Sequence, residues 1–422
     1  MSMPIQLSIL PPLAADDSIL AAFAATEDRR VLNTADDRPN TATLPIQIDP
    51  ASDHADSRVA DRRADVEEKH YRIIEYLDAT GFDAIILGRT DSIAWFTSGA
   101  DLGQSLGGDT ASAWLYVNRN CRAVIADNVQ SARIFEEELA GLGFQLKERP
   151  WHEEPERVLK ELAHGKRVAT DDGKSGEQDA LRALRLRLTK LDRRHYRELG
   201  RTLTLAIEAT ARNFQPGETE ADLAGHLAHR LLREGVVPVD LRVAGDDRLD
   251  RYRRPLFKSA EIHRRAVIGA TGRRHGLCAS ATRIVSFGPV EQEFRQAHAL
   301  ASMVDATYIF FSRPGEPVSE IFRRAKRIYE KYQAPHEWML DYQGFATGFS
   351  PCEFPLRPDD GTLKIEPDTA LRWSPSVGPT RSEDTIVVDG RGYEVVTEAQ
   401  RWPKVEVVVK GFGIKRPGIL ER

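Results

Sequence analysis

The chain has 422 residues, which is enough for two or more domains, and it carries a formal net charge of −5. Hydrophobic residues make up 41% of the sequence and charged residues 29%, a composition typical of soluble globular proteins. These values argue against a broad nucleic-acid-binding surface, and no apolar run is long enough to predict a membrane span.

Residues 1–60 are rich in Ala, Asp, Pro and Thr and poor in aromatic residues, so we expect a disordered or loosely packed arm. The N-terminus lacks a basic segment followed by an apolar one, and we expect no secretory signal. The three cysteines, Cys121, Cys278 and Cys352, are far apart and odd in number, which favours a reducing environment over a disulfide framework. We therefore expect a cytoplasmic protein.

Residues 61–175 alternate between helical and strand patterns, which predicts an α/β domain. The first helix is expected at 66–81, where apolar residues recur at helical spacing up to a glycine. Strands are expected after it at 83–88, 92–99, 111–118, 122–127 and 167–172. Further helices are expected at 128–143 and 154–164.

Residues 176–422 combine helix pairs with consecutive strands, which predicts an α+β domain. Helices are expected at 181–214, 218–235, 291–311 and 317–333. Strands are expected at 238–246, 265–287, 369–376, 384–397 and 404–411. The strand pair at 265–287 contains the turn and strand GLCASATR (276–283), and it has neither Asp nor Glu.

Four features occur in chain order: PGETEADLAGHL (216–227), the hairpin ending TRIVSFG (282–288), QGFATGF (343–349) and SPSVGPTRSEDTIVVDGRGYEVVT (374–397). This order resembles the pita-bread superfamily of creatinase, aminopeptidase P, prolidase and methionine aminopeptidase, over roughly residues 60–410. The resemblance implies a C-terminal pita-bread domain preceded by an α/β creatinase-type N-terminal domain. It also implies a homodimer.

Hydrolytic members of this superfamily hold two divalent metals with two Asp, one His and two Glu, because two cations need several anionic ligands. The matching positions in this chain are Gly269, Ser280, Tyr342, Ser374 and Glu383. Only the last of them keeps its ligand, and one carboxylate cannot hold two metals. We therefore expect no bound divalent metal and no other cofactor.

The matching positions imply a concavity that has lost its metal ligands but keeps several hydrogen-bond donors. Its expected ligand-binding side chains are Arg254, Arg283, Gln343, Trp373 and Arg381. Guanidinium groups favour a carboxylate or phosphate ligand. The structural alternative is that Arg283 pairs with Glu383 and only joins two strands.

Other residues are interpreted as structural. HxxH at His226 and His229 is a weak metal signal, and Cys278 on the hairpin is more typical of a core side chain than of a ligand. His275 is expected in a solvated turn, and the basic stretches RRHYRELGR (193–201) and FRRAKRIYEKY (322–332) are expected on solvated helix faces.

Three functions remain open at the level of sequence. The first is a non-hydrolytic protein, similar to Xaa-Pro aminopeptidase and prolidase, that binds a small anionic or peptide-like ligand or a protein partner. The second is a metal-independent C–N hydrolase of creatinase type, although Arg253 and Arg254 stand where that resemblance implies a His and His263 lies further along. The third is an active metallo-aminopeptidase that cleaves Xaa-Pro peptides.

Overall fold

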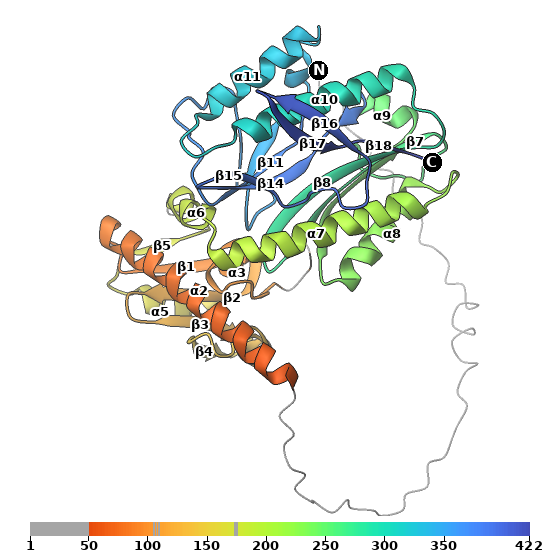
Figure 1. Cartoon of the computed structure of the whole chain (residues 1–422). Helices are drawn as coiled ribbons and strands as arrows, with labels where there is room; N and C mark the ends of the chain where they lie inside the picture. The colour runs from red at the N-terminus through yellow and green to blue at the C-terminus, as the bar shows by residue number, and fades with distance from the viewer. Residues whose placement is uncertain (1–49, 104–105, 107, 109, 173–175) are drawn as a thin grey trace, which may run out of the picture. The chain divides into compact units, whose positions relative to one another are not determined.

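The computed structural model describes residues 50–422 except 104–105, 107, 109 and 173–175 (Figure 1). The expected arm therefore lies mostly outside the described residues. Its last part is helical, because α2 (Pro50–Thr80) begins well before the helix expected from the sequence. No helix in the described ranges is long and apolar enough to cross a membrane.

The N-terminal part of the described chain is built around a mixed five-stranded sheet in the order β4-β3-β2-β1-β5. Its strands are β1 (Ala84–Arg89), β2 (Thr110–Asn118), β3 (Arg122–Asp127), β4 (Gln145–Arg149) and β5 (Val168–Thr170). The strand β2 is antiparallel to both of its neighbours, β1 and β3, whereas β4 and β5 join the sheet as parallel edges. The helices of this part are α3 (Thr90–Phe96), α4 (Ser131–Arg133), a π-helical turn (Ile134–Glu138), α5 (Pro155–Ala163) and α6 (Gln178–Leu186).

Two expectations for this part were wrong. The expected strand at 92–99 is the helix α3, in which every residue from Asp91 to Phe96 is buried. In a short run that is buried on all sides, apolar residues do not alternate with polar ones. The sequence therefore shows neither the helical nor the strand periodicity and could not distinguish the two. The expected helix at 128–143 is confined to α4 and the π-helical turn.

The expected helix at 181–214 is two helices, α6 and α7 (Lys190–Asn213). Thr189 ends the connection between them, because its hydroxyl accepts from the Asp192 amide while the Asp192 carboxylate accepts from the Thr189 amide. This capping box satisfies amides that the first helical turn leaves unpaired. Thr219 and Asp222 start α8 (Glu220–Arg233) in the same way.

The C-terminal part contains two larger sheets and two hairpins. The first sheet has the order β18-β8-β7-β6, with β6 (Val237–Gly245), β7 (Arg265–Arg274), β8 (Leu277–Ser286) and β18 (Ile419–Glu421). The second has the order β10-β9-β11-β14-β15, with β9 (Gly344–Thr347), β10 (Phe354–Pro355), β11 (Thr369–Trp373), β14 (Asp384–Asp389) and β15 (Gly392–Val395). The hairpins are β12 (Ser376–Val377) with β13 (Thr380–Arg381), and β16 (Lys404–Val409) with β17 (Phe412–Pro417).

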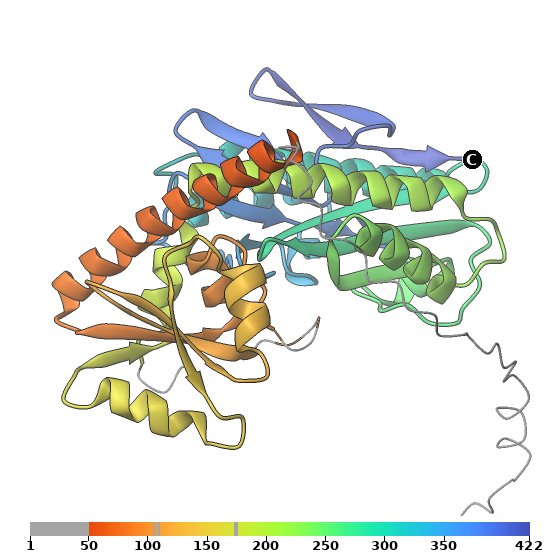
Figure 2. The ribbon, with the colours of Figure 1, turned by 90° about the horizontal axis from the view of Figure 1, so that it is seen from below.

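Helices cover these sheets on the outside. Figure 2 shows α7 and α8 running along the sheet that contains β7 and β8, and both helices contact its strands. The other helices are α9 (Asp247–Arg251), α10 (Gln292–Phe311), α11 (Val318–Lys331) and the 3-10 turn η2 (Glu337–Met339). Helix α10 packs against α11 and against the β16–β17 hairpin.

The two larger sheets meet along β8 and the start of β14. The Thr282 amide donates to the Glu383 carbonyl at 3.2 Å, and the Ser280 amide donates to the Thr385 hydroxyl at 2.8 Å. This junction brings Glu383 next to the hairpin that the sequence analysis singled out. The fold thus brings Glu383 close to Gly269 and Ser280, two of the positions expected from the sequence.

Candidate functional site

Glu383 is a fully buried carboxylate held by side chains from three strands. Its Oε1 accepts from Nε of Arg372 on β11 at 2.6 Å and from Nη1 of Arg242 on β6 at 3.1 Å. Its Oε2 accepts from the hydroxyl of Thr282 on β8. Burial opposes ionisation, but the guanidinium groups of Arg242, Arg372 and Arg381 hold the pKa of Glu383 well below its usual value.

Gly269 and Ser280 lie on the hairpin of β7 and β8 and supply no charged group. A Cβ atom at Gly269 would be 2.7 Å from the Thr282 hydroxyl and 3.6 Å from Nη2 of Arg242. Arg242 pairs with Gly269 across the two strands, so its side chain extends beside a position that has none. The Ser280 hydroxyl shares a hydrogen bond of 2.8 Å with that of Thr271. The hairpin therefore presents hydroxyls in this region, and the neighbouring strand β6 presents the Arg242 guanidinium.

Tyr342 does not line this region. The residue is 63% exposed, and the centre of its ring lies 5.4 Å from the Arg254 guanidinium, whereas Phe345 of the same segment approaches Arg372. Phe345 pairs with Arg372 across β9 and β11, and the Arg372 guanidinium lies 5.3 Å from the centre of its ring. Strand β9 begins at Gly344, after Tyr342. The motif QGFATGF does not reveal where the strand begins, so the sequence alone could not show that Phe345 lies opposite Arg372.

Gln343 and Trp373 belong to the packed interior rather than to a ligand site. The Gln343 carboxamide oxygen accepts from the Tyr329 hydroxyl at 3.0 Å, and its amide nitrogen donates to backbone carbonyls. The Trp373 ring stacks on Tyr308 with centroids 4.3 Å apart, and its Nε1 donates to the Ser312 hydroxyl at 2.9 Å. Their predicted ligand-binding role finds no support in these contacts.

Arg283 does not pair with Glu383, which corrects the structural alternative raised by the sequence. Its Nη1 donates to the Asp384 carboxylate at 3.2 Å, and its Nη2 donates to the Thr397 carbonyl at 2.8 Å. The side chain is fully buried in these contacts. Arg283 therefore links β8 to β14, but through the neighbouring acid.

Ser374, Arg254 and Arg381 form a second group around Asp341. Arg381 donates to the Ser374 hydroxyl at 2.6 Å and to Asp341, and Arg254 donates to Asp341 through Nε. Burial is the main reason that the pKa of Arg381 falls to about 10, with the nearby Arg254 charge acting in the same direction. Because Arg381 stays protonated near neutral pH, this group remains an ion cluster.

A small cavity of about 30 Å³ lies between these two groups. Its polar lining consists of Arg242, Tyr252, Arg253, Arg254, Thr282, Ser376, Thr380 and Arg381. Because a water molecule needs roughly 10–15 Å³, the cavity holds about two waters or one small ion. Nη2 of Arg242 is buried beside it and has no hydrogen-bond partner among the described residues.

The charges around the cavity nearly balance. Five arginines form ion pairs with four carboxylates, namely Arg242, Arg253, Arg254, Arg372 and Arg381 with Asp240, Glu337, Asp341 and Glu383. One positive charge is left over. The sequence analysis missed Arg242, because only the pairing of β6 with β7 shows that it lies opposite Gly269.

A two-metal site does not fit these residues. The described residues contain no cluster of three or more His, Cys, Asp or Glu side chains that could hold a metal. Both oxygens of Glu383 already accept from donors, and two of those donors are cations. Divalent cations need several anionic oxygens, whereas this arrangement surrounds a single carboxylate with positive charge.

The remaining candidates lie elsewhere. His226 pairs with Glu218 and His263 with Glu261, and all four side chains reach solvent. Cys278 is buried, and burial raises the pKa of its thiol to about 12. These contacts agree with structural roles for His226 and Cys278.

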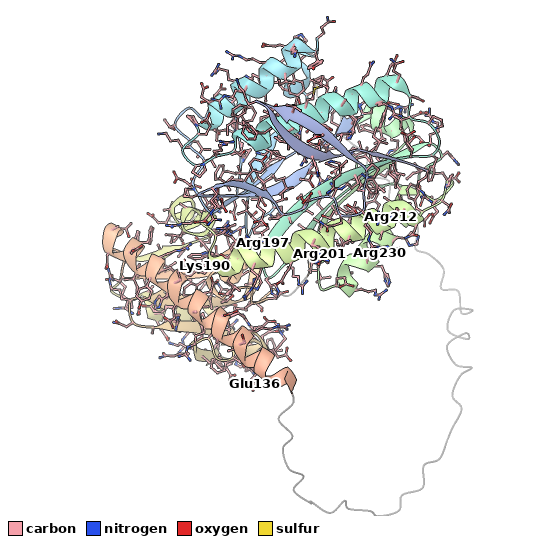
Figure 3. All side chains as sticks on the ribbon, in the orientation of Figure 1. Glu136, Lys190, Arg197, Arg201, Arg212 and Arg230 are labelled. Carbon is pink, nitrogen blue, oxygen red and sulfur yellow. The ribbon has the colours of Figure 1, made fainter. Side chains whose placement is uncertain are left out.

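The basic stretch RRHYRELGR lies on a solvated face of α7, as expected. Figure 3 labels Lys190, Arg197, Arg201 and Arg212 along this helix. The Arg197 side chain is 50% exposed and pairs with Glu394. A compensated, half-exposed face of this kind needs no ligand.

Solved structures with similar folds are prolidases and Xaa-Pro aminopeptidases. The prolidase of Pyrococcus horikoshii matches with a TM-score of 0.65 and 16% identity, over 79% of this chain and 99% of its own. The X-Pro aminopeptidase of Thermotoga maritima matches with a TM-score of 0.67 and 16% identity, over 84% and 99%. The N-terminal domain of the FACT complex subunit SPT16 of chickpea matches with a TM-score of 0.57 and 12% identity, over 80% and 96%.

Sequence comparison gives a weaker signal. An uncharacterized peptidase of Staphylococcus aureus is 23% identical over 206 residues, which are 46% of this chain. The match spans 58% of the length of that peptidase, and no family model matches the chain. At these identities the comparisons show the fold, so this chain has the pita-bread fold of the prolidases and Xaa-Pro aminopeptidases.

Proposed function

We propose that this protein is a non-hydrolytic member of the prolidase-like fold that binds a small anion at the Glu383 cavity. The observation that carries the proposal is that neither carboxylate oxygen of Glu383 is free. Both accept hydrogen bonds, from Arg242, Arg372 and Thr282. A peptidase of this fold needs that carboxylate as a metal ligand. Here it serves as the counter-ion of buried arginines.

The ligand class follows from the charge and size of the cavity. One positive charge is in excess, and Nη2 of Arg242 is an unused donor. A guanidinium prefers a planar carboxylate because two parallel hydrogen bonds can form. With room for about two waters, the cavity fits formate or the carboxylate end of a ligand that enters from outside.

The other functions fit less well. A creatinase-type reaction needs a general base, and no histidine lines the cavity in the part of the chain that is described. His263, the sequence candidate, is an exposed partner of Glu261. Binding of a protein partner, a homodimer and a cytoplasmic location remain proposals, and the likeness to a domain of a complex subunit supports the first of them.

Metal analysis and peptidase assays test the hydrolytic part of the proposal. Purified full-length chain, incubated with Mn²⁺ or Co²⁺ and desalted, should retain far less than one metal per chain and should not cleave Xaa-Pro dipeptides. A prolidase treated in parallel is the positive control. Stoichiometric metal together with cleavage would overturn the proposal.

Calorimetric titration tests the binding part. Formate should bind with a Kd in the millimolar range, and Arg242→Gln should abolish binding because it removes the free donor. Arg197→Gln on the surface of α7 is the matched control and should leave binding unchanged. If formate binds neither the parent protein nor the Arg197→Gln control, the cavity holds only water and the proposed anion binding is wrong.

A further inference from the structure

A second cavity, much larger than the first, lies between α10, α11 and β16. Its volume is about 840 Å³, and it shares no lining residue with the cavity at Glu383. In Figure 1 the β16–β17 hairpin lies beside α10 and α11, and the contacts of α10 agree with this view. The apolar part of the wall consists of Ala299, Met303, Phe311, Ile328, Val405, Val407, Val408, Val409 and Ile419. The size falls within the range of small-molecule sites, about 300–1,000 Å³.

The wall formed by α10 contains two polar side chains without partners. His298 is 4% exposed and Ser302 is fully buried, and both line the cavity one helical turn apart. Neither Nδ1 of His298 nor the Ser302 hydroxyl has a hydrogen-bond partner among the described residues. Buried polar atoms are normally satisfied, so these two atoms point to a ligand or ordered water in the cavity.

The protonation of His298 defines what it can bind. Its Nε2 lies 3.0 Å from the Pro417 carbonyl, which can only accept, so Nε2 carries the hydrogen. Burial lowers the pKa of His298 to about 4, and the ring is neutral near pH 7. Nδ1 is then an acceptor, and together with the Ser302 hydroxyl it suits a ligand hydroxyl.

The mouth of the cavity is basic. Exposed Arg327, Lys331 and Lys410 line it and form no ion pair with any described residue. Two further cations, Arg295 and Arg324, are already paired with acids. The only acid in the lining is Glu406. The field at the mouth therefore favours an anionic group.

We propose that this cavity binds an amphipathic organic anion, with an apolar chain between α10, α11 and β16. The carboxylate of the ligand lies at Arg327, Lys331 and Lys410, and a hydroxyl at its inner end bonds His298 Nδ1 and the Ser302 hydroxyl. The apolar walls supply most of the binding free energy through burial of the chain. The polar side chains at the two ends of the cavity fix the orientation of the ligand, and the basic ones select an anionic over a cationic head group.

Titration with three probes of equal chain length tests the proposal on the full-length chain below their micelle concentrations. Dodecanoate should bind at one site per chain. ω-Hydroxydodecanoate should bind about two- to tenfold more tightly, because its hydroxyl exchanges water for hydrogen bonds to His298 Nδ1 and the Ser302 hydroxyl. Dodecyltrimethylammonium should bind at least about tenfold more weakly than dodecanoate, because its charge is repelled at the mouth.

Variants of α10 and α11 locate the site. Ala299→Trp fills the cavity from an exposed helix position and should weaken dodecanoate at least about tenfold. Gln296→Trp introduces the same side chain at an exposed position outside the lining and should not. Ser302→Ala should leave dodecanoate binding unchanged and reduce the preference for the hydroxylated probe, because the ligand hydroxyl loses one of its two partners. Lys331→Glu should weaken dodecanoate and strengthen the cationic probe.

The results that would overturn this proposal differ from those that would overturn anion binding at the Glu383 cavity. The proposal is overturned if neither acid binds, if Ala299→Trp and Gln296→Trp have equal effects, or if the cationic probe binds as tightly as dodecanoate. A strand-forming peptide that binds along β16 while both acids fail is also a contradictory result. Formate binding at Arg242 can succeed or fail independently, because the two cavities have no residue in common.

Discussion

At the scale of single residues, Glu383 is the carboxylate around which the buried arginines of the candidate site are arranged. It is the one position of the matched ligand set that keeps its carboxylate, and it is fully buried between Arg242, Arg372 and Thr282. A buried charge is stable only when its partners compensate for lost hydration. In this chain the guanidinium groups of Arg242 and Arg372 supply that compensation.

Glu383→Gln should therefore be strongly destabilising. The substitution leaves buried Arg372 without its counter-ion and Arg242 with Asp240 alone, and breaking a buried ion pair costs about 3–5 kcal/mol. Glu394→Gln breaks the half-exposed pair with Arg197 and should cost less than about 1 kcal/mol. Urea unfolding of both variants measures the difference. Equal, small losses would mean that the arginines have another counter-ion.

At the scale of elements, α10, β14 and β17 are tied together by one buried charge network. Arg416 on β17 donates to Asp305 on α10 and to Asp384 on β14, and Ser382 also donates to Asp305. The second oxygen of Asp305 has no partner among the described residues. One guanidinium thus pairs with two carboxylates. For Asp305, burial disfavours the charged form more than the ion pair and the Ser382 hydrogen bond favour it.

This imbalance predicts a pH dependence of stability. Burial raises the pKa of Asp305 to about 7 despite the opposing charge of Arg416, whereas an unfolded Asp titrates near about 4. Between these values the folded state binds more protons, so the contribution of Asp305 is full below pH ~4 and is lost as the pH rises to ~7. Urea unfolding from pH 4 to 8 should show this decline in the parent and not in Asp305→Asn. Parallel profiles for the two proteins would contradict the assignment.

At the scale of the described chain, Arg185 links the N-terminal sheet region to the C-terminal part. It lies on α6, donates to Asp91 of α3 at 3.0 Å, and donates through Nε to Glu353 at 3.0 Å. Both carboxylates are buried, and Glu353 stands in the connection between β9 and β10. The contact joins segments far apart in sequence through one side chain.

Arg185→Ala should weaken this link and the whole fold. It leaves buried Glu353 without its cation, while Asp91 keeps Arg89, which predicts a loss of about 3–5 kcal/mol in the free energy of unfolding. Arg182→Ala, on the same helix, breaks only the pair with the exposed Asp179 and should cost less than about 1 kcal/mol. Thermal and urea unfolding compare the two, and a loss in Arg185→Ala no larger than that in the control would count against the role of this link.

Local patterns were enough for most elements of the fold. The helices at 291–311 and 317–333 and the strands at 122–127 and 384–397 were confirmed, because period and turn residues are properties of neighbouring positions. The segment at 92–99 was assigned wrongly because its residues are buried whichever structure they adopt. The order of motifs predicted the pita-bread fold, and the comparisons confirmed it.

The sequence by itself determined that the hairpin from Arg265 to Phe287 carries no carboxylate, since an absent side chain is absent in any fold. Only the tertiary structure decided what replaced it. Strand register places Arg242 opposite Gly269 and Phe345 beside Arg372, and it separates Arg283 from Glu383. Such pairings join segments far apart in the chain, and no local period encodes them. The large cavity beside β16 arises in the same way, from packing between elements.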